Sequence, residues 1–180
     1  MPQFPEIDDR FHSFIEQQKI FFVGTAAPDG RVNTAPKGMD SLRVLGPHRI
    51  VWLNLTGGEN ESAAHLRENT RMTLMWCAFD GPPMILRVYG NATVIHPRDP
   101  GWSEFAPLFP ALPGARQIFD LTVDLVLRSC GMGVPFFEFR GPREALRQWA
   151  EKIGDSGIKE FWKNNNQVSL DGKPTGILEP

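Results

Sequence analysis

A single lysine and a polar loop that follows it in the chain carry the residue types best suited to chemistry. Lys37 stands in a Pro-Lys-Gly step, shortly after Asn33 and Thr34. The loop Thr56–Ser62 leads into a predicted helix that begins near Asn60. A cationic side chain and the unpaired N–H groups of a helix start both attract anions. Each charge-assisted hydrogen bond contributes about 1.5 to 3 kcal/mol, so these residues suit a phosphate group.

Both features also have simpler interpretations. A lone lysine in a turn is usually a solvated side chain, and Asn60 and Ser62 are ordinary capping residues at the start of a helix. The residue types alone therefore leave the phosphate site and these structural roles about equally open.

The elements that must position these residues are mostly strands. Branched, aromatic and alternating apolar residues separated by Gly, Pro and Asp turns predict six strands, at 20–27, 31–36, 50–55, 71–79, 84–95 and 118–131. Gly90 lies inside the fifth of these and indicates a bulge or a close backbone approach. We expect a mainly β fold, a six-stranded antiparallel barrel with peripheral helices.

Helices are predicted at both ends of the chain and after the polar loop. A short amphipathic helix begins near Ile7, and a second covers about 61–68 with Asn60 as its N-cap. Two more are expected within 142–165, with Pro142 at a first helical position. The proline-interrupted segment from Pro97 to Pro113 has no clear assignment, although its aromatic residues could form one apolar face made of Trp102, Phe105, Leu108 and Phe109. We expect one domain over residues 1–180, with a C-terminal helical extension from about 142.

Composition excludes several classes of function. The 180 residues carry a formal net charge of −2 and no basic run, so a nucleic-acid partner is not expected. No apolar run is long enough to span a membrane, no signal peptide is evident, and only two cysteines occur, so we expect a cytoplasmic protein. The four histidines lack metal-ligand spacing, and hydrolase, P-loop and dinucleotide-binding motifs are missing. We expect no metal site.

Longer stretches of the chain resemble a known family. FFVGTAAPDGRVNTAPKGMDS, then VWLNLTGGENESAAHL and ENTRMTL, resemble the pyridoxamine 5'-phosphate oxidase-like family of FMN-binding split barrels. The later pieces GPPMILRVYGNATV, SCGMGVPFFEF and NNNQVSLDGKPTG resemble a subgroup of that family without assigned activity. The resemblance covers about Phe11 to Gly176 and rests on the order and spacing of these pieces.

The resemblance implies a split barrel that forms a homodimer, with FMN in clefts at the subunit interface. By position, it implies that Lys37 approaches the FMN, and that Asn33, Thr34 and Pro36 lie beside it. The segment that holds the phosphate would include Thr56, Asn60 and Ser62. Arg87 would lie on a long strand near the dimer cleft. The segment Ser129–Pro135 would contact the partner subunit, and its Gly131 and Gly133 would let the backbone approach a flat ring.

The chain also departs from the pattern of the named oxidase. Val32 stands five positions before Lys37, where the oxidase has an arginine, and Arg31 is expected on the opposite face of the strand. Glu61 and Ser62 replace an Arg-Lys pair, and the C-terminal substrate-binding arginine and histidine have no match. FMN binding is compatible with these changes, whereas oxidation of pyridoxamine phosphate does not follow.

The implied function is an FMN-dependent oxidoreductase acting on an unidentified small molecule. Hydride transfer to a flavin needs no acid or base from the protein, so no catalytic residue is assigned. Three alternatives remain open: a flavin-binding carrier or sensor without turnover, a barrel that binds haem or the deazaflavin F420, and an empty barrel that acts only as a dimeric scaffold. His65 or His96 could ligate a haem, although neither lies in a recognisable ligating sequence.

Overall fold

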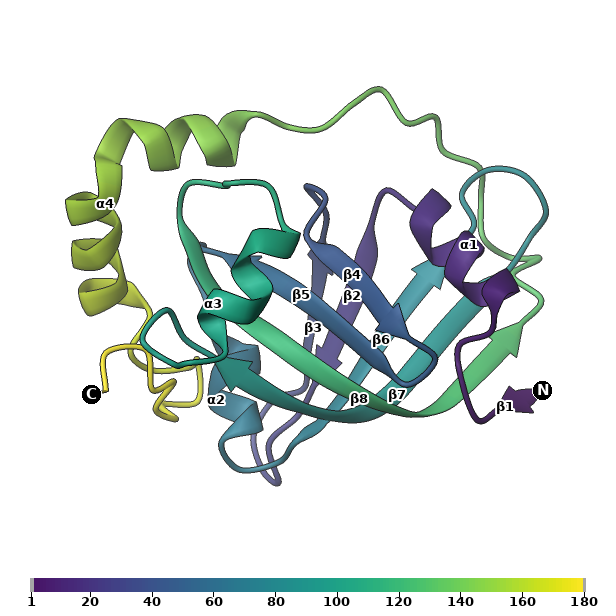
Figure 1. The fold of residues 1–180 in the computed structure, drawn as a ribbon, viewed down its shortest axis with the longest axis horizontal. Helices are drawn as coiled ribbons and strands as arrows, with labels where there is room; N and C mark the ends of the chain where they lie inside the picture. Colours follow the sequence, from purple (N-terminus) through teal and green to yellow (C-terminus); the bar gives the residue numbers. More distant parts are fainter. Residues whose placement is uncertain (1, 180) are drawn as a thin grey trace.

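The computed structural model describes residues 2–179, which form one antiparallel sheet with helices around it (Figure 1). The strands are β1 (Gln3–Phe4), β2 (Phe21–Thr25), β3 (Asn33–Lys37), β4 (Leu42–Gly46), β5 (Arg49–Leu55), β6 (Arg71–Cys77), β7 (Ile85–Ile95) and β8 (Ala115–Ser129). The helices are α1 (Asp9–Gln17), α2 (Glu61–Leu66), α3 (Trp102–Phe105) with the 3₁₀ turn η1 (Ala106–Leu108), and α4 (Ala145–Asn165). The predicted mainly β class is confirmed.

The sheet is an open barrel. Its strands lie in the order β3-β2-β6-β7-β8-β5-β4, and β1 pairs with β8. Because β3 and β4 end this order without pairing with each other, the barrel is split along a seam between them. Antiparallel neighbours along the chain can be joined by short turns, which is why closely spaced strand segments form the hairpins β2–β3 and β4–β5 and the meander β6–β7–β8.

The expected count of six strands is too low, because the structure has eight. All six predicted strands are present, as β2, β3, β5, β6, β7 and β8. The first addition is β4, which the chain reaches through a turn where Met39 and Asp40 take positive φ values of 64° and 54°. The second is β1, whose two residues are too few to show an alternating pattern.

The core lies on the concave side of the sheet. Side chains that face each other across β2, β6, β7 and β8 are fully buried there, namely Val23, Leu74, Val88 and Val126. Trp52 stacks on Phe119 with ring centroids 4.3 Å apart. Helix α1 closes one end with Phe11, Phe14 and Ile15, and its N-cap is Asp8. Each fully buried aliphatic side chain of this kind contributes about 1.5 to 3 kcal/mol.

Gly90 lies at a bulge and at a close backbone approach, the two features that the sequence indicated. The register of β7 and β8 shifts between Tyr89 and Gly90, which is a bulge. A Cβ atom at Gly90 would lie 1.9 Å from the backbone oxygen of Thr122, so no larger residue fits without displacing β8.

The Pro97–Pro113 segment forms a cap on the convex side of β5 and β8. Phe105 of α3 and Phe109 are buried against Val51, Leu53 and Ile118. The predicted apolar face therefore forms in part, because Leu108 remains 39% exposed.

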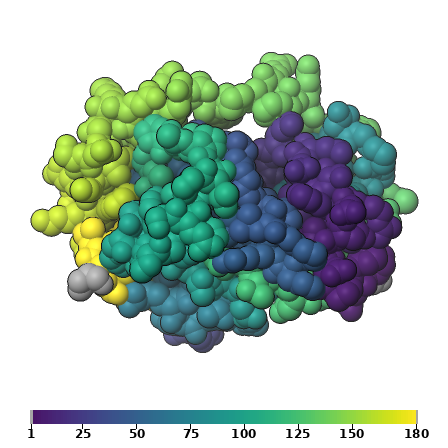
Figure 2. All heavy atoms as spheres, in the orientation of Figure 1, coloured from purple at the N-terminus to yellow at the C-terminus, as the bar shows by residue number. Residues whose placement is uncertain are grey.

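The C-terminal part begins with an arm, residues 130–144, that contains neither helix nor strand. Figure 1 shows this arm arching above the ends of β3 and β4 toward α4, and Figure 2 shows a hollow between the green arm and the body. Helix α4 is interrupted at Gly154, where φ is 65° and ψ is 179°, so two helical segments meet there, as predicted. Pro142 precedes the helix, which starts only at Ala145, so its predicted place at a first helical position is wrong. No helix among residues 2–179 is long and apolar enough to cross a membrane.

Candidate functional site

Lys37 reaches from β3 across the seam to β5, the strand next to edge strand β4. Side chains alternate along β3, so Asn33, Ala35 and Lys37 face the same way as the buried side of β2. The amine of Lys37 donates to the side-chain oxygen of Asn54 on β5 at 3.2 Å. It also lies 5.6 Å from the ring centre of Trp52. Lys37 is therefore half-buried and held in place, and is not a freely solvated turn residue.

Behind Lys37 lies a buried polar group that sequence reasoning missed. Asn54 donates to Gln117 on β8 at 3.3 Å, and Arg116 precedes Gln117 in the strand. Arg116 is 1% exposed and donates only to neutral oxygens, those of Gly57, Glu59 and Asn166. An Arg-Gln pair at the start of a buried strand was the available signal, but the sequence does not indicate that both side chains point inward.

Two positive charges thus lie close together without a carboxylate partner. Burial, together with the charge of Arg116 and against the opposing charge of Glu59, lowers the pKa of Lys37 to about 8. Burial also lowers the pKa of Arg116, although a guanidinium stays protonated near neutral pH. Neither cation forms an ion pair with an acidic side chain among residues 2–179. An anionic ligand would relieve this unbalanced charge.

The Thr56–Ser62 loop lies against this group, and its residues have distinct environments. The Thr56 hydroxyl donates to the Gly114 oxygen at 2.8 Å and accepts from the Trp162 ring at 2.8 Å, so the chain itself engages it. Asn60 is 2% exposed, and neither its oxygen nor its nitrogen has a partner. It occupies the N-cap position of α2 but makes no side-chain capping bond, contrary to expectation.

Ser62 contacts the opposite end of β3. Its hydroxyl accepts from the Asn33 amide at 3.1 Å, and Thr25 donates to it at 3.5 Å. Thr25 also contacts Nδ1 of His65 at 3.1 Å. Asn33 and Ser62, two of the predicted site residues, are therefore in direct contact.

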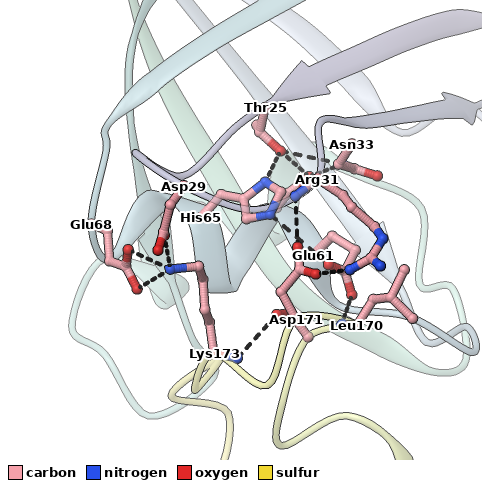
Figure 3. A network of polar contacts seen from close by, with 12 residues as sticks. Thr25, Asp29, Arg31, Asn33, Glu61, His65, Glu68, Leu170, Asp171 and Lys173 are labelled. Atoms are coloured by element: carbon pink, nitrogen blue, oxygen red, sulfur yellow. Dashed lines mark hydrogen bonds and ion pairs between the residues drawn. The ribbon is translucent and has the colours of Figure 1, made fainter.

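The C-terminal turn fastens over this region (Figure 3). Asp171 pairs with Arg31 in the β2–β3 turn, and Lys173 pairs with Asp29 at 2.6 Å and with Glu68 at 2.9 Å. The amide of Leu170 donates to Glu61 at 2.8 Å. Arg31 is thus used by the chain's own C-terminal turn and does not replace the arginine missing at Val32.

Thr34, Pro36, Arg87 and Ser129 belong to the opposite, outer face of the sheet. Direct partners across antiparallel strands share a face, and one row across the sheet consists of Pro36, Phe22, Met75, Arg87 and Leu127. The next row consists of Thr34, Gly24, Thr73, Tyr89 and Leu125. The guanidinium of Arg87 donates to the Ser129 hydroxyl at 3.2 Å, so these two predicted residues also meet.

This outer face, defined by the two rows, is mostly apolar and only partly covered. Its side chains on β2, β6, β7 and β8 are half-buried, and a hollow of about 420 Å³ opens on it beside Gly24, Thr73 and Tyr89. The two predicted glycines in the adjoining arm differ. Gly131 has φ 69°, and a Cβ there would lie 2.7 Å from the Met84 nitrogen, whereas a Cβ at Gly133 would meet nothing within 4 Å.

Comparison with known proteins identifies the family. The family model described as pyridoxamine 5'-phosphate oxidase matches residues 7–130. A curated relative, the pyridoxamine 5'-phosphate oxidase family protein ustO of Aspergillus flavus, is 34% identical over 193 aligned positions, covering 97% of this chain and 78% of the relative. The chain belongs to the pyridoxamine 5'-phosphate oxidase family.

Solved structures of low sequence identity share the fold of this family member. A putative pyridoxamine 5'-phosphate oxidase from Lactobacillus delbrueckii gives a TM-score of 0.55 at 20% identity, over 71% of this chain and 99% of that one. HupZ of Group A Streptococcus gives 0.53 at 13% identity, over 73% and 99%. The expected fold family is therefore confirmed.

The structure gives no support to histidine ligation in this family member. His65 is 1% exposed and His96 is 7% exposed, so both side chains are buried. No cluster of three or more metal-binding side chains occurs among residues 2–179. The donors gathered around β3 instead suit a ligand with an anionic group.

Proposed function

We propose that this member of the pyridoxamine 5'-phosphate oxidase family binds FMN along β3 and acts as an FMN-dependent oxidoreductase. The observation that carries the proposal is the pair of cations, Lys37 and Arg116, without an acidic partner beside a loop with a buried, unpartnered Asn60. An FMN phosphate carries the negative charge that this arrangement lacks.

The donor set fits FMN by its chemistry. A phosphate offers only acceptors, and the region offers the Lys37 amine, the Asn60 amide nitrogen and the unpartnered Nε2 of Gln117. Buried donors without partners cost about 1 to 3 kcal/mol each, so a ligand that satisfies them gains binding energy. Thr56 is committed to Gly114 and Trp162, so its proposed role is to shape the loop.

When bound, FMN supplies hydride or electron transfer, and the protein supplies binding and orientation. The Lys37 amine would pair with negative charge on the ligand, and its hydrogen bond to Asn54 would fix its direction. Thr34 and Pro36, on the outer side of the same strand, would border the ring, and Arg87 would be aimed toward it by Ser129. The chain from residue 1 to 180 would act as one cofactor-binding domain.

The proposal includes a homodimer with FMN at the subunit interface. Sheet faces exposed to water normally carry polar residues, but the outer face carries Phe22, Met75, Leu125 and Leu127. The neighbouring arm exposes Met132 at 81% and Phe136 at 79%. A second copy that covers this face would bury both sets of side chains and close a cleft over Arg87 and Pro36.

The direct test is the spectrum and thermal unfolding of the purified protein. We expect a yellow preparation, or a colourless one that gains flavin absorbance and a higher Tm when FMN is added. A ligand that binds only the folded state must raise apparent stability. A colourless protein whose Tm is unchanged by excess FMN would exclude the proposal.

A second measurement separates an oxidoreductase from a flavin carrier. NADH or NADPH is added to the FMN-loaded protein under anaerobic conditions, and loss of the flavin absorbance band is followed. Repeated bleaching and recovery on admission of air supports turnover. A stable flavin spectrum with every donor tried supports a carrier or sensor.

A further inference from the structure

We propose that Arg116 and Asn166 are positioning residues that orient the Gly57–Asn60 backbone to bind a phosphate monoester. This inference rests on the proposed function and deepens it, because it names the part of the ligand that the C-terminal helix helps to recognise. Arg116 lies outside the segments that carry the family resemblance, and Asn166 lies in the C-terminal piece NNNQVSLDGKPTG, for which the resemblance implied no flavin contact.

The first step is the contact geometry on the carbonyl side of the loop. Arg116 donates to the Gly57 oxygen at 3.4 Å and to the Glu59 oxygen at 2.9 Å. Asn166, at the end of α4, donates to the Gly57 oxygen at 3.1 Å and the Gly58 oxygen at 3.3 Å. Three consecutive carbonyl groups are therefore held by two buried side chains, both less than 2% exposed.

The second step follows from the planar trans peptide. In each peptide unit the N–H points opposite to the C=O. Because the oxygens of residues 57, 58 and 59 face Arg116 and Asn166, the amides of Gly58, Glu59 and Asn60 face the other side. Successive backbone N–H groups of this kind make anion-binding concavities.

The third step is that the loop has open space beside its glycines and an unpartnered polar side chain at its end. A Cβ atom added at Gly57 or Gly58 would meet nothing within 4 Å. The Asn60 side chain at the end of the loop is buried, and both of its polar atoms are unpartnered. Lys37 is close enough for the charge of Arg116 to lower its pKa. Space, donors and positive charge thus coincide at one place.

The two positioning residues are themselves held in place. Asn166 accepts a hydrogen bond from Arg116 at 2.8 Å, and its backbone oxygen accepts from the Thr175 hydroxyl at 2.6 Å. Trp162, one turn earlier in α4, donates to Thr56 at the start of the loop. A fully buried guanidinium with only neutral partners is costly to retain. Arg116 would offset this cost by supplying positive charge to the ligand and by orienting the Gly57–Asn60 loop.

The inference predicts selectivity for the phosphorylated flavin. Asn166→Ala and Arg116→Met should each raise the Kd for FMN at least about tenfold, since one charge-assisted bond corresponds to that factor or more. The Kd for riboflavin, which lacks the phosphate, should change less than about twofold. Arg116→Lys keeps the charge and should restore part of the FMN affinity.

The experiment measures both Kd values by quenching of flavin fluorescence in the full-length protein. Gln167→Ala, next to Asn166 but exposed and outside the loop contacts, is the matched control and should leave both values unchanged. Circular dichroism confirms folding, and Asn166→Ala serves alone if Arg116→Met does not fold.

Three results would overturn the inference. In the first, the variants weaken FMN and riboflavin equally, which would make the residues merely structural. In the second, the variants bind FMN as the wild type does. In the third, the wild type binds both flavins equally well, so that the phosphate contributes nothing. A wild type that binds neither flavin would instead exclude the proposed function, and this inference with it.

Discussion

The amine of Lys37 and the side-chain oxygen of Asn54 lie 3.2 Å apart and join the free edge strand β3 to β5 across the seam of the barrel. Through Asn54, Lys37 joins a polar group that also contains Gln117 and Arg116. The contact places a cation at the open seam of the barrel, over the aromatic ring of Trp52.

Removal of the Lys37 amine should weaken FMN binding. Lys37→Met keeps the aliphatic stem but removes the charge, so we expect the Kd for FMN to rise about ten- to a hundredfold. Fluorescence titration measures the change. Lys159→Met, at an exposed position on α4, is the matched control and should leave the Kd unaltered. An unchanged Kd in Lys37→Met would return Lys37 to a structural role.

Binding should also depend on pH through the same amine. The pKa of Lys37 is about 8 in the free protein, and a bound anion raises it. Above pH 8 the Lys37 amine must therefore take up a proton when the ligand binds, and the affinity for FMN should fall by up to about tenfold per pH unit. Titrations at pH 7, 8, 9 and 9.5 test this, and Lys37→Arg should flatten the profile. A wild-type profile as flat as that of Lys37→Arg would contradict the assignment.

The same pKa shift has an opposite effect on the unliganded protein. The folded-state pKa lies below the ordinary value of 10.5, so the unfolded chain binds more protons between about pH 8 and 10.5. The contribution of Lys37 to stability therefore increases as the pH rises through that window. Urea unfolding across this range should show a higher free energy of unfolding for Lys37→Met than for the wild type. This difference in free energy should narrow as the pH increases.

A charge on the outer face should prevent dimer formation. Phe22→Asp places a carboxylate in this face between Pro36 and Met75, two strands away from Arg87. We expect a monomer in analytical ultracentrifugation and reduced FMN retention, because burying an unpaired charge costs several kcal/mol. Leu45→Asp, on the exposed side of edge strand β4, is the control. A dimer that persists in Phe22→Asp would show that another surface mediates association.

Gly90 offers a test of the fold that is independent of any ligand. Gly90→Ala should destabilise the protein by about 3 kcal/mol, because its Cβ would lie 1.9 Å from the Thr122 oxygen. Gly46→Ala, in a strand position where a Cβ meets nothing within 4 Å, should change stability by less than about 1 kcal/mol. Chemical denaturation of both variants gives the comparison, and equal effects would disprove the close approach of β7 and β8.

The sequence by itself determined the strand segments, the bulge at Gly90, the interruption of the C-terminal helix at Gly154 and the family. Each of these depends on local properties: apolar alternation, the backbone freedom of glycine, and the order of short motifs. For the same reason the sequence missed β1, which is too short to alternate, and β4, which follows a turn formed by Met39 and Asp40 without glycine at those two positions.

Only the tertiary structure decided which polar side chains meet. Arg116, Asn54 and Asn166 are far apart in the chain and carry no local mark of a site, yet strand pairing and the packing of α4 bring them to one loop. The same packing takes Thr56 and Arg31 out of the set of free donors and separates Lys37 from Thr34 and Pro36 onto opposite faces of β3. Long-range hydrogen bonds and the alternation of a strand fix these outcomes, and neither can be read from neighbouring residues alone.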